Sequence, residues 1–251
     1  VHISFSALIF VVILVFNFIY NYAILKGSLM KNNFLITTPT QRLLPAYSVV
    51  AFLLSVVIGL TIWFTGSNHG LFLTINQQHA LMPTQFWLAF NLLSYSKFFI
   101  LPTLLIVLTF VWRRDKLANV ILLIIVYYAV FAGLKHLIGE ARPYMVLPEG
   151  SFFWINLYEN AVKSAYLSFP SGHTGNMAVF AFSMNMLFFS NKKGLQFLML
   201  ALVVATALAR ICTGWRWPLD VLASSLIGYL LVKICFAINL KYFKRKNNAR
   251  Y

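Results

Sequence analysis

Residues 117–143 read LANVILLIIVYYAVFAGLKHLIGEARP, and the 18 residues from 117 to 134 carry no charged side chain. An α-helix rises about 1.5 Å per residue, so about 20 apolar residues cross the hydrocarbon core of a bilayer. The run is therefore predicted to form a transmembrane helix over 117–138. Lysine and arginine are costly at membrane depth, so Lys135 and Arg142 mark the end of this span.

The composition of the whole chain predicts a membrane protein with several such helices. Of its 251 residues, 61% are apolar and 10% are charged, whereas soluble domains have about 45–50% apolar and about 25% charged residues. The two cysteines, Cys212 and Cys235, lie inside apolar runs, which excludes a disulfide-rich secreted scaffold. Disorder and collagen are excluded as well. We expect an all-α, polytopic transmembrane bundle.

Seven candidate spans can be read along the chain. They are 3–25, 47–64, 97–112, 117–138, 174–190, 195–213 and 221–240. They predict an N-terminal transmembrane helix with a cytoplasmic connector (1–46), a six-helix core (47–240) and a basic cytoplasmic tail (241–251). The first segment has the alternative of a signal peptide, but it lacks a basic start and is too long, so we expect a retained helix.

The excess of positive charge predicts the orientation of these spans. The net charge is +15, from 20 Lys and Arg residues against 5 Asp and Glu residues. Basic proteins often bind nucleic acid, but membrane proteins carry excess Lys and Arg on cytoplasmic loops, so we expect the lipid bilayer and no nucleic acid as partner. The basic groups after the first, third, fifth and seventh spans fall on one side, which places the C-terminus in the cytoplasm. The outer side is then 65–96, 139–173 and 214–220.

Two aromatic segments lie on this outer side. Residues 83–94, PTQFWLAFNLLS, are predicted to form a short interfacial helix with Phe86 and Trp87 near the headgroups. The loop from Tyr144 to Leu167 is also rich in aromatic residues. It is expected either to shape the entrance of a site or to belong to an aromatic interfacial belt.

The outer segments also carry three groups of ionisable or polar residues at span ends. In the first group, Lys135 and Arg142 are seven residues apart, or two helical turns, so both can lie on one face of a helix. Alone, this spacing is a weak indication of a site. Lys and Arg near a span end usually extend to the lipid headgroups.

The second group, FPSGHT at 169–174, is a tight turn just before the fifth span. The N–H groups and the dipole of a following helix N-terminus favour an anion. Ser171 adds a hydroxyl donor, and His173 can donate or accept a proton near neutral pH. The alternative is that Ser171 or Thr174 only caps the helix.

The third group lies between the sixth and seventh spans. Arg210 lies inside an otherwise apolar helix, where it needs an anion or a carboxylate as partner. Arg216 and Asp220 are four residues apart, a spacing at which side chains meet on a helix. The alternative to a site is therefore an Arg216–Asp220 ion pair that only fixes the turn.

Together, the three groups supply cations that suit a phosphate group, since Arg forms bidentate contacts and Lys acts as a point charge. The order K-x6-R-P, then P-S-G-H, then R-x5-(position 216)-x3-D resembles the type-2 phosphatidic acid phosphatase family of membrane lipid phosphatases. The resemblance covers about residues 47–240 and implies a six-helix phosphatase core, to which the N-terminal helix is an addition. It implies hydrolysis of a phosphomonoester or diphosphate on a lipid, without a metal or another cofactor.

The resemblance also implies a role for each motif residue. The phosphate-binding residues would be Lys135, Arg142, Ser171, Gly172 and Arg210. His173 would be the general acid, and Asp220 would orient the nucleophile. The nucleophile of the family is a histidine at the position of residue 216, and it forms a phosphohistidine intermediate.

This sequence departs from the family pattern at the nucleophile. Position 216 is arginine, in GWRWPLD, where the family has histidine. Arginine stays protonated in proteins and has no lone pair to attack phosphorus, so covalent phosphoryl transfer is not expected of the chain as written. We expect an inactivating substitution in a pocket otherwise built for turnover. A natural, non-catalytic lipid-phosphate binding protein is the alternative.

The same motifs would also serve a phosphotransferase that passes the phosphoryl group to another lipid. Expected lipids are undecaprenyl diphosphate, phosphatidylglycerophosphate, phosphatidate and a lipid A phosphate. The short loops favour a bacterial inner membrane, with the site on the periplasmic face, and the oligomeric state stays open. A small transporter is disfavoured, because the ionisable groups gather at one face rather than at the bilayer midplane.

Overall fold

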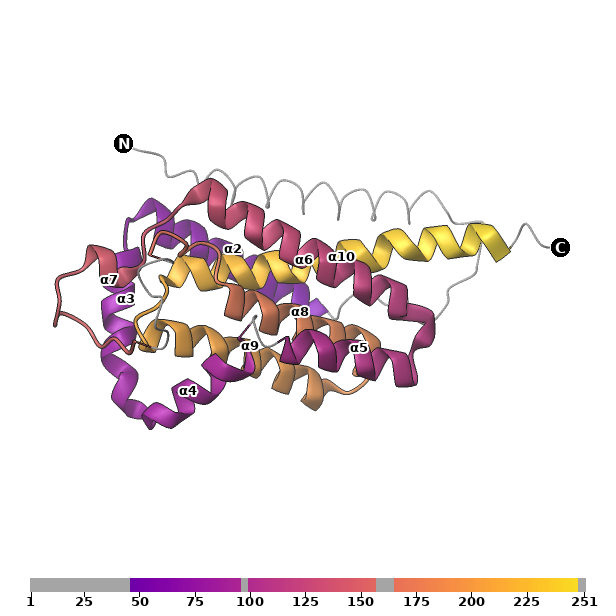
Figure 1. The fold of residues 1–251 in the computed structure, drawn as a ribbon, viewed down its shortest axis with the longest axis horizontal. Coiled ribbons are helices and arrows are strands. Elements are labelled where there is room, and N and C mark those ends of the chain that lie inside the picture. The colour runs from indigo at the N-terminus through magenta and orange to yellow at the C-terminus, as the bar shows by residue number, and fades with distance from the viewer. Residues whose placement is uncertain (1–45, 96–98, 157–164, 248–251) are drawn as a thin grey trace.

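The computed structural model describes residues 46–95, 99–156 and 165–247. Within these ranges the chain is built of helices joined by turns and loops, without a strand. Figure 1 shows the long helices lying along the long axis of the molecule. The prediction of an all-α bundle is thus confirmed. The predicted first span at 3–25 lies outside the described residues.

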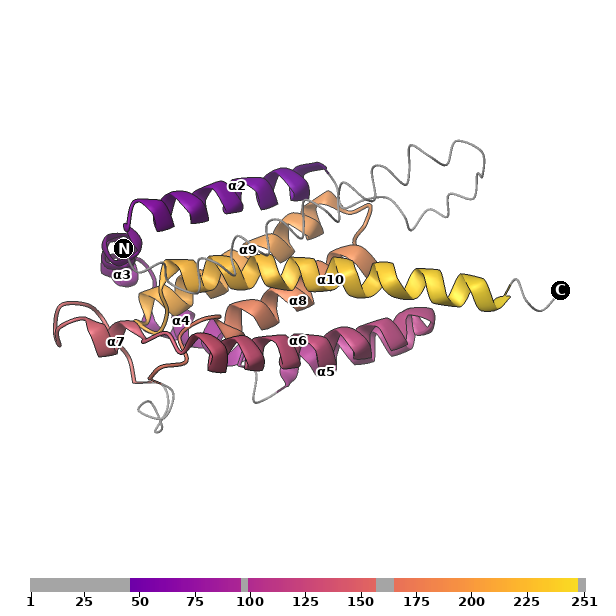
Figure 2. The ribbon, with the colours of Figure 1, turned by 90° about the horizontal axis from the view of Figure 1, so that it is seen from above.

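Long helices occupy each of the spans predicted between 47 and 240. They are α2 (Ala46–Phe64), α5 (Ile100–Trp112), α6 (Leu117–Ile138), α8 (Gly172–Leu187), α9 (Lys193–Cys212) and α10 (Pro218–Asn247). By length and apolar composition, three segments of the described chain can each cross a bilayer: Arg114–Val146, Lys193–Cys212 and Pro218–Ala237. Figure 2 shows α2 on one flank of the bundle and α5 with α6 on the other, with α10 between them.

Helix α8 lies inside the bundle and packs against α5, α9 and α10. Two glycines allow this close packing. A Cβ at Gly175 would lie 2.3 Å from Cε1 of Phe131 on α6, and a Cβ at Gly228 of α10 would lie 2.9 Å from Cβ of Ala178. Small residues let helix backbones approach closely in membrane proteins. The neighbouring helices therefore pack closely around the 16 residues of α8.

At one end of the bundle, shorter helices run across the long ones (Figure 1). After α2, the chain bends by 111° into α3 (Asn68–Asn76) and the 3₁₀ helix η2 (Gln77–Leu81). The bend includes Gly66, whose φ of 64° suits glycine. The sequence did not predict α3, because its short apolar pattern is broken by polar residues.

The predicted helix at 83–94 is confirmed as α4 (Thr84–Leu93). The predicted headgroup position of Trp87 is wrong. Its side chain is buried against Ala209 and Cys212 of α9, and Nε1 donates to the backbone oxygen of His79 at 2.8 Å. An indole with a partner for its N–H can be buried, so Trp87 anchors α4 to the bundle.

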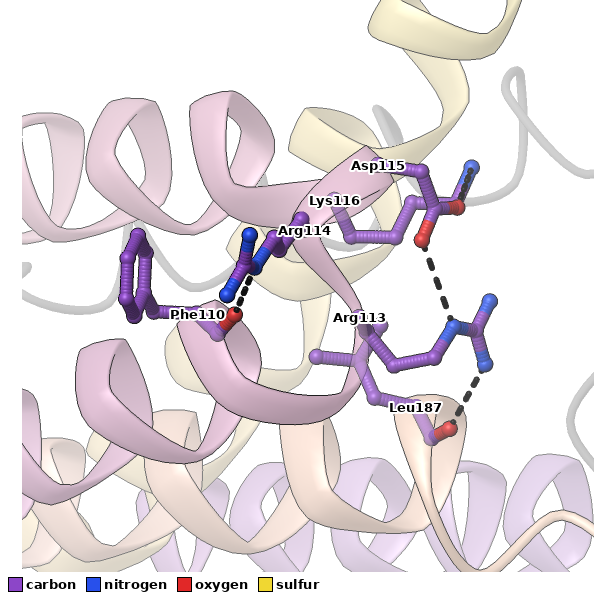
Figure 3. Close-up of polar contacts among 6 residues, drawn as sticks. All are labelled: Phe110, Arg113, Arg114, Asp115, Lys116 and Leu187. Carbon is purple, nitrogen blue, oxygen red and sulfur yellow. Dashed lines mark hydrogen bonds and ion pairs between the residues drawn. The ribbon is translucent and has the colours of Figure 1, made fainter.

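At the opposite end, the turn between α5 and α6 closes the bundle. It contains the 3₁₀ helix η4 (Arg114–Lys116). Figure 3 shows Arg113 between two partners: its Nη1 donates to the backbone oxygen of Leu187 at 2.9 Å, and its Nε lies 3.5 Å from Asp115 Oδ1. Lys116 lies 3.9 Å from the same carboxylate. A cation at the C-terminus of α8 also complements the helix dipole.

Candidate active site

The first motif leaves α6 before its arginine. Helix α6 ends at Ile138, and Gly139 follows it with a φ of 59°. Arg142 is the N-cap of the short helix α7 (Pro143–Val146). The prediction that Lys135 and Arg142 share one helix face is therefore wrong, because the left-handed glycine stops α6 between them.

Lys135 turns toward the second motif. Its Nζ donates to the backbone oxygens of Leu167 at 3.3 Å and Pro170 at 2.9 Å. Its Cε would lie 3.9 Å from a Cβ placed on Gly172. Arg142 is buried, and its backbone N–H donates to the oxygen of Ala165 at 2.9 Å. Both cations of the first motif thus lie beside the segment that precedes α8.

The second motif forms the N-terminus of α8. Ser171 is the N-cap, and its Oγ accepts from the backbone N–H of Thr174 at 3.4 Å. The capping function considered from the sequence is therefore present. His173 follows in the first turn, is 6% exposed, and its ring centroid lies 5.4 Å from that of Tyr95. The oxygen of Gly172 accepts from the Tyr127 hydroxyl at 2.7 Å.

The third motif brings two buried arginines into the same region. Arg210 lies in the last turn of α9, and its Nη1 donates to Oδ1 of Asn91 on α4. Arg216 lies in the turn between α9 and α10, is 3% exposed, and donates from Nη1 to the oxygen of Leu167 at 2.6 Å. Its Nε is buried and has no hydrogen-bond partner among the residues that the structure describes.

Asp220 holds the second motif against α10. Its Oδ2 accepts from Ser168 Oγ at 2.5 Å and from the backbone N–H of Trp217 at 3.0 Å. The expected Arg216–Asp220 ion pair is not among the ion pairs of the described residues. Arg216 is instead drawn to the carbonyl of Leu167.

The segment 167–170 is the point where the three motifs meet. It accepts or donates hydrogen bonds with Lys135, Arg216 and Asp220. The four cations of the motifs lie in two pairs here. Lys135 and Arg216 both donate to the oxygen of Leu167, at 3.3 and 2.6 Å, and Cζ of Arg142 and of Arg210 lies 4.9 and 5.5 Å from the ring centroid of Trp215, the neighbour of Arg216. The three motifs are therefore brought together.

Positive charge dominates this region. Burial, followed by the neighbouring guanidinium groups of Arg142 and Arg210, lowers the pKa of Arg216. The carboxylate of Asp220 acts in the opposite direction. Burial, followed by the neighbouring carboxylate of Asp220, raises the pKa of Glu140 to about 9. Among the described residues, no three His, Cys, Asp or Glu side chains gather as metal ligands would.

Helix α3 fixes both ends of the turn that carries Arg216. Asn68 Oδ1 accepts from the backbone N–H of Leu219 at 3.2 Å, at the start of α10. Asn76 Nδ2 donates to the oxygen of Ile211 at 2.9 Å, at the end of α9. Sequence analysis missed both asparagines, because each lies in a short helix that the apolar pattern does not reveal.

The loop after α7 packs on the same turn. A Cβ at Gly214, whose φ is 77°, would lie 2.8 Å from the backbone oxygen of Phe153, so glycine is required there. Asn76 Oδ1 also accepts from the N–H of Phe153 at 2.7 Å. The Trp215 Nε1 group donates to the oxygen of Ile155 at 2.8 Å. In its described part, the aromatic loop thus belongs to the wall of the site.

The chain is similar to known proteins in both sequence and structure. The sequence model of the PAP2 superfamily matches residues 116–244. The structure is similar to that of LpxE from Aquifex aeolicus, with 25% sequence identity, a TM-score of 0.56, and 68% of this chain and 94% of that chain covered. It is also similar to the first transmembrane PAP2 type phosphatidylglycerolphosphate phosphatase from Bacillus subtilis, with 23% identity, a TM-score of 0.56, and 77% and 96% covered. No curated protein matches the chain significantly.

Proposed function

We propose a function from one premise: the chain belongs to the PAP2 superfamily. It is an integral membrane protein of the lipid phosphatase class, and its three motifs form one pocket for the phosphate group of a membrane lipid. With arginine at position 216, the pocket binds this group without forming a phosphohistidine. The observation that carries the proposal is the arrangement of four cations: Lys135 and Arg216 share the oxygen of Leu167, and Arg142 and Arg210 share the ring of Trp215.

The charge balance of the pocket supports an anionic ligand. Four cations lie near two acidic groups, Asp220 and Glu140, and these two carboxyl groups interact with each other. A phosphate monoester carries about −1.5 to −2 charges at neutral pH. Such a group would neutralise the excess of cations, and the electrostatic gain is larger in a buried site than in water.

The guanidinium of Arg216 supports the same ligand. One nitrogen, Nη1, donates to Leu167, while Nε is buried and has no hydrogen-bond partner. A buried charged donor without an acceptor is unfavourable. A phosphate oxygen would supply the acceptor, and arginine suits phosphate because its donors are arranged in a planar fork.

Arginine at this position also explains why we expect binding without turnover. A guanidinium has no lone pair for an in-line attack on phosphorus. The resemblance assigns two further groups to catalysis. His173 would transfer a proton to the leaving lipid oxygen, and Asp220, which accepts from Ser168 and Trp217, would orient the residue at position 216.

Histidine at position 216 would complete the chemistry of the family. Its imidazole would attack phosphorus while His173 protonates the departing oxygen. Water, activated by His173 as a base, would then cleave the phosphohistidine. The lysine and the arginines would stabilise the charge on the phosphoryl oxygens in both steps.

The ligand is expected to be an amphiphile. The ends of α6, α8 and α9 that carry the motifs lie at the end of the bundle where α3 and α4 run across the long helices (Figure 1). This position suits a phosphate at headgroup depth with its tails in lipid. The candidate lipids are phosphatidylglycerophosphate, phosphatidate, undecaprenyl diphosphate and a lipid A phosphate. The name of the similar Bacillus subtilis protein makes phosphatidylglycerophosphate the first to test.

The test compares the chain with Arg216→His and with Arg216→Gln in detergent micelles. Phosphate release is measured with each of the four lipids. We expect release from at least one lipid with Arg216→His and none with the parent chain. Arg216→Gln is the matched control, because it removes the guanidinium without supplying a nucleophile.

Binding is measured in parallel with the parent chain. Inorganic phosphate and dihexanoyl phosphatidate are expected to raise its melting temperature. A chloride salt at the same ionic strength is expected to leave the melting temperature unchanged. Absence of both lipid hydrolysis by Arg216→His and phosphate binding by the parent chain would overturn the proposal.

A further inference from the structure

We propose that Trp215 is a positioning residue whose indole holds the guanidinium groups of Arg142 and Arg210 in the phosphate pocket. This inference rests on the proposed function, since it assigns phosphate binding to these two arginines. The Cζ atom of Arg142 lies 4.9 Å from the centroid of the Trp215 ring, and that of Arg210 lies 5.5 Å from it. Both distances are within the range of cation–π attraction.

The ring of Trp215 offsets the electrostatic repulsion between Arg142 and Arg210. Arg142 comes from the N-terminus of α7 and Arg210 from the end of α9, so neither backbone sets the distance between their side chains. Two buried guanidinium groups repel each other. Trp215 attracts both without adding a negative charge that would compete with phosphate. Tryptophan is the side chain best suited to this, because its ring has the strongest cation–π attraction.

The indole is itself fixed in place. Trp215 is fully buried, and its Nε1 donates to the oxygen of Ile155 at 2.8 Å. Its backbone N–H donates to the oxygen of Arg210 at 3.0 Å, so the ring is held close to one of its two partners. The ring of Tyr144 packs on it edge-to-face, with centroids 5.5 Å apart. Because these contacts fix the indole, it can in turn hold the two guanidinium groups in place.

Asn91 complements the indole on Arg210. Its Oδ1 accepts from Nη1 of Arg210, and its Nδ2 donates to the backbone oxygen of Trp87 at 2.8 Å. The asparagine is 2% exposed, so this contact is shielded from water. A neutral amide orients the guanidinium and leaves its charge available. An aspartate here would form an ion pair and weaken the attraction for phosphate.

The experiment measures binding of dihexanoyl phosphatidate to the full chain in detergent by calorimetry. Trp215→Phe keeps a weaker aromatic ring, and Trp215→Leu removes it. We expect the dissociation constant to rise about threefold with Phe and about tenfold with Leu, in line with the strength of cation–π contacts. Trp87→Phe is the matched control: it also removes a buried indole bonded to a backbone oxygen, its ring packs on Ala209 and Cys212, and the backbone oxygen that accepts from Asn91 is kept.

A double-variant comparison separates positioning from a general structural role. In a chain with Arg142→Gln and Arg210→Gln, Trp215→Phe is expected to leave the residual affinity unchanged, since the ring has no cation to hold. A loss of affinity as large as in the parent chain would overturn the inference. The inference would also be overturned if the single variants Trp215→Leu and Trp215→Phe bound dihexanoyl phosphatidate with the same affinity as Trp87→Phe.

The two proposals fail in different ways. If Arg142→Gln with Arg210→Gln binds dihexanoyl phosphatidate as tightly as the parent chain, the proposed phosphate pocket is wrong. If that double variant binds weakly while Trp215→Leu binds normally, the pocket stands and the positioning role of Trp215 is wrong. The melting temperature of each variant without lipid is recorded as well, and Trp215→Phe serves as the test wherever Trp215→Leu does not fold.

Discussion

A single side chain, Arg216, determines what the pocket can do. It is buried beside Arg142 and Arg210, and its charge has Asp220 nearby without an ion pair to it among the described residues. Its Nε has no hydrogen-bond partner. This geometry is unfavourable for the protein alone and favourable for a complex with an anion. Removing the guanidinium of Arg216 is therefore expected to raise the stability of the protein without ligand and to weaken phosphate binding.

Replacing Arg216 by glutamine tests this opposition. Without phosphate, we expect Arg216→Gln to stabilise the protein by about 1–3 kcal/mol, because a buried donor without an acceptor costs about this much. The shift in melting temperature caused by inorganic phosphate should shrink at the same time. Thermal unfolding in detergent, with and without phosphate, measures both effects.

Arg113→Gln is the control for this experiment. It also removes an arginine that donates to a backbone oxygen, but it lies in the turn between α5 and α6, at the opposite end of the bundle (Figure 1). It should leave the effect of phosphate unchanged. A lower melting temperature for Arg216→Gln in the absence of phosphate would contradict the prediction.

At the scale of elements, the packing of α8 places the second motif. Its N-terminus carries His173, and its position depends on the glycines that bring neighbouring helices close. Gly175 lies in the same turn region as the motif and has the ring of Phe131 against it. The backbone of α8 cannot shift here without moving Ser171 and His173. The packing of this helix and the geometry of the pocket are thus coupled.

Gly175→Ala is predicted to destabilise the protein and to impair the pocket. The new methyl group would lie 2.3 Å from two atoms of the Phe131 ring, so the ring or the helix must move. Overpacking of this kind costs about 1–3 kcal/mol. We expect a lower melting temperature together with weaker binding of dihexanoyl phosphatidate, measured on the same sample.

Gly133→Ala on α6 provides the comparison. No atom lies within 4 Å of the added Cβ, so the helix propensity of alanine should leave the stability unchanged or raise it slightly. Equal melting temperatures for Gly133→Ala and Gly175→Ala would contradict the prediction, because they would show that the contact between Gly175 and Phe131 leaves room for a methyl group.

Sequence analysis predicted the long helices well and the cross-running helices only in part. The span at 117–138 has the same bounds as α6, because a long apolar run favours the helix and Gly139 ends it. The motif residues that lie together in the structure could be identified because their motifs stand at span ends. Asn68, Asn76 and Asn91 were missed. Their roles depend on which backbone groups and side chains lie opposite them, and these partners are distant in the sequence.

Two errors of side-chain placement have the same physical origin. Trp87 was expected at the headgroups, since an aromatic residue in a short outer helix is typical of an interface. Arg142 was expected on the face of α6, since seven residues match two turns. Periodicity describes a helix in isolation. The packing of α4 on α9, and the left-handed conformation of Gly139, are set by tertiary structure and by one backbone angle.

At the scale of the whole molecule, the two ends of the bundle differ in chemistry. One end has the pocket and the cross-running helices, and the other has the basic turn around Arg113 and the C-terminal end of α10 (Figures 1 and 2). Membrane proteins keep loops rich in Lys and Arg on the cytoplasmic side. We therefore predict that the pocket opens on the outer face of the membrane.

Cysteine labelling in intact cells tests this orientation. The exposed residues Glu149 and Lys192 lie in loops at the two ends, and the native Cys212 and Cys235 are buried. A membrane-impermeant maleimide should label Glu149→Cys in intact cells and Lys192→Cys only after permeabilisation. The reverse pattern would place the pocket in the cytoplasm.

The asparagines of α3 hold the backbone on both sides of position 216 without using its side chain. The residue at this point can consequently be exchanged while its surroundings keep their shape. Evolution could alternate between a hydrolytic protein and a lipid receptor through one amino-acid replacement, with no rebuilding of the scaffold. In this sense the rigid frame makes the catalytic identity of the protein easy to change.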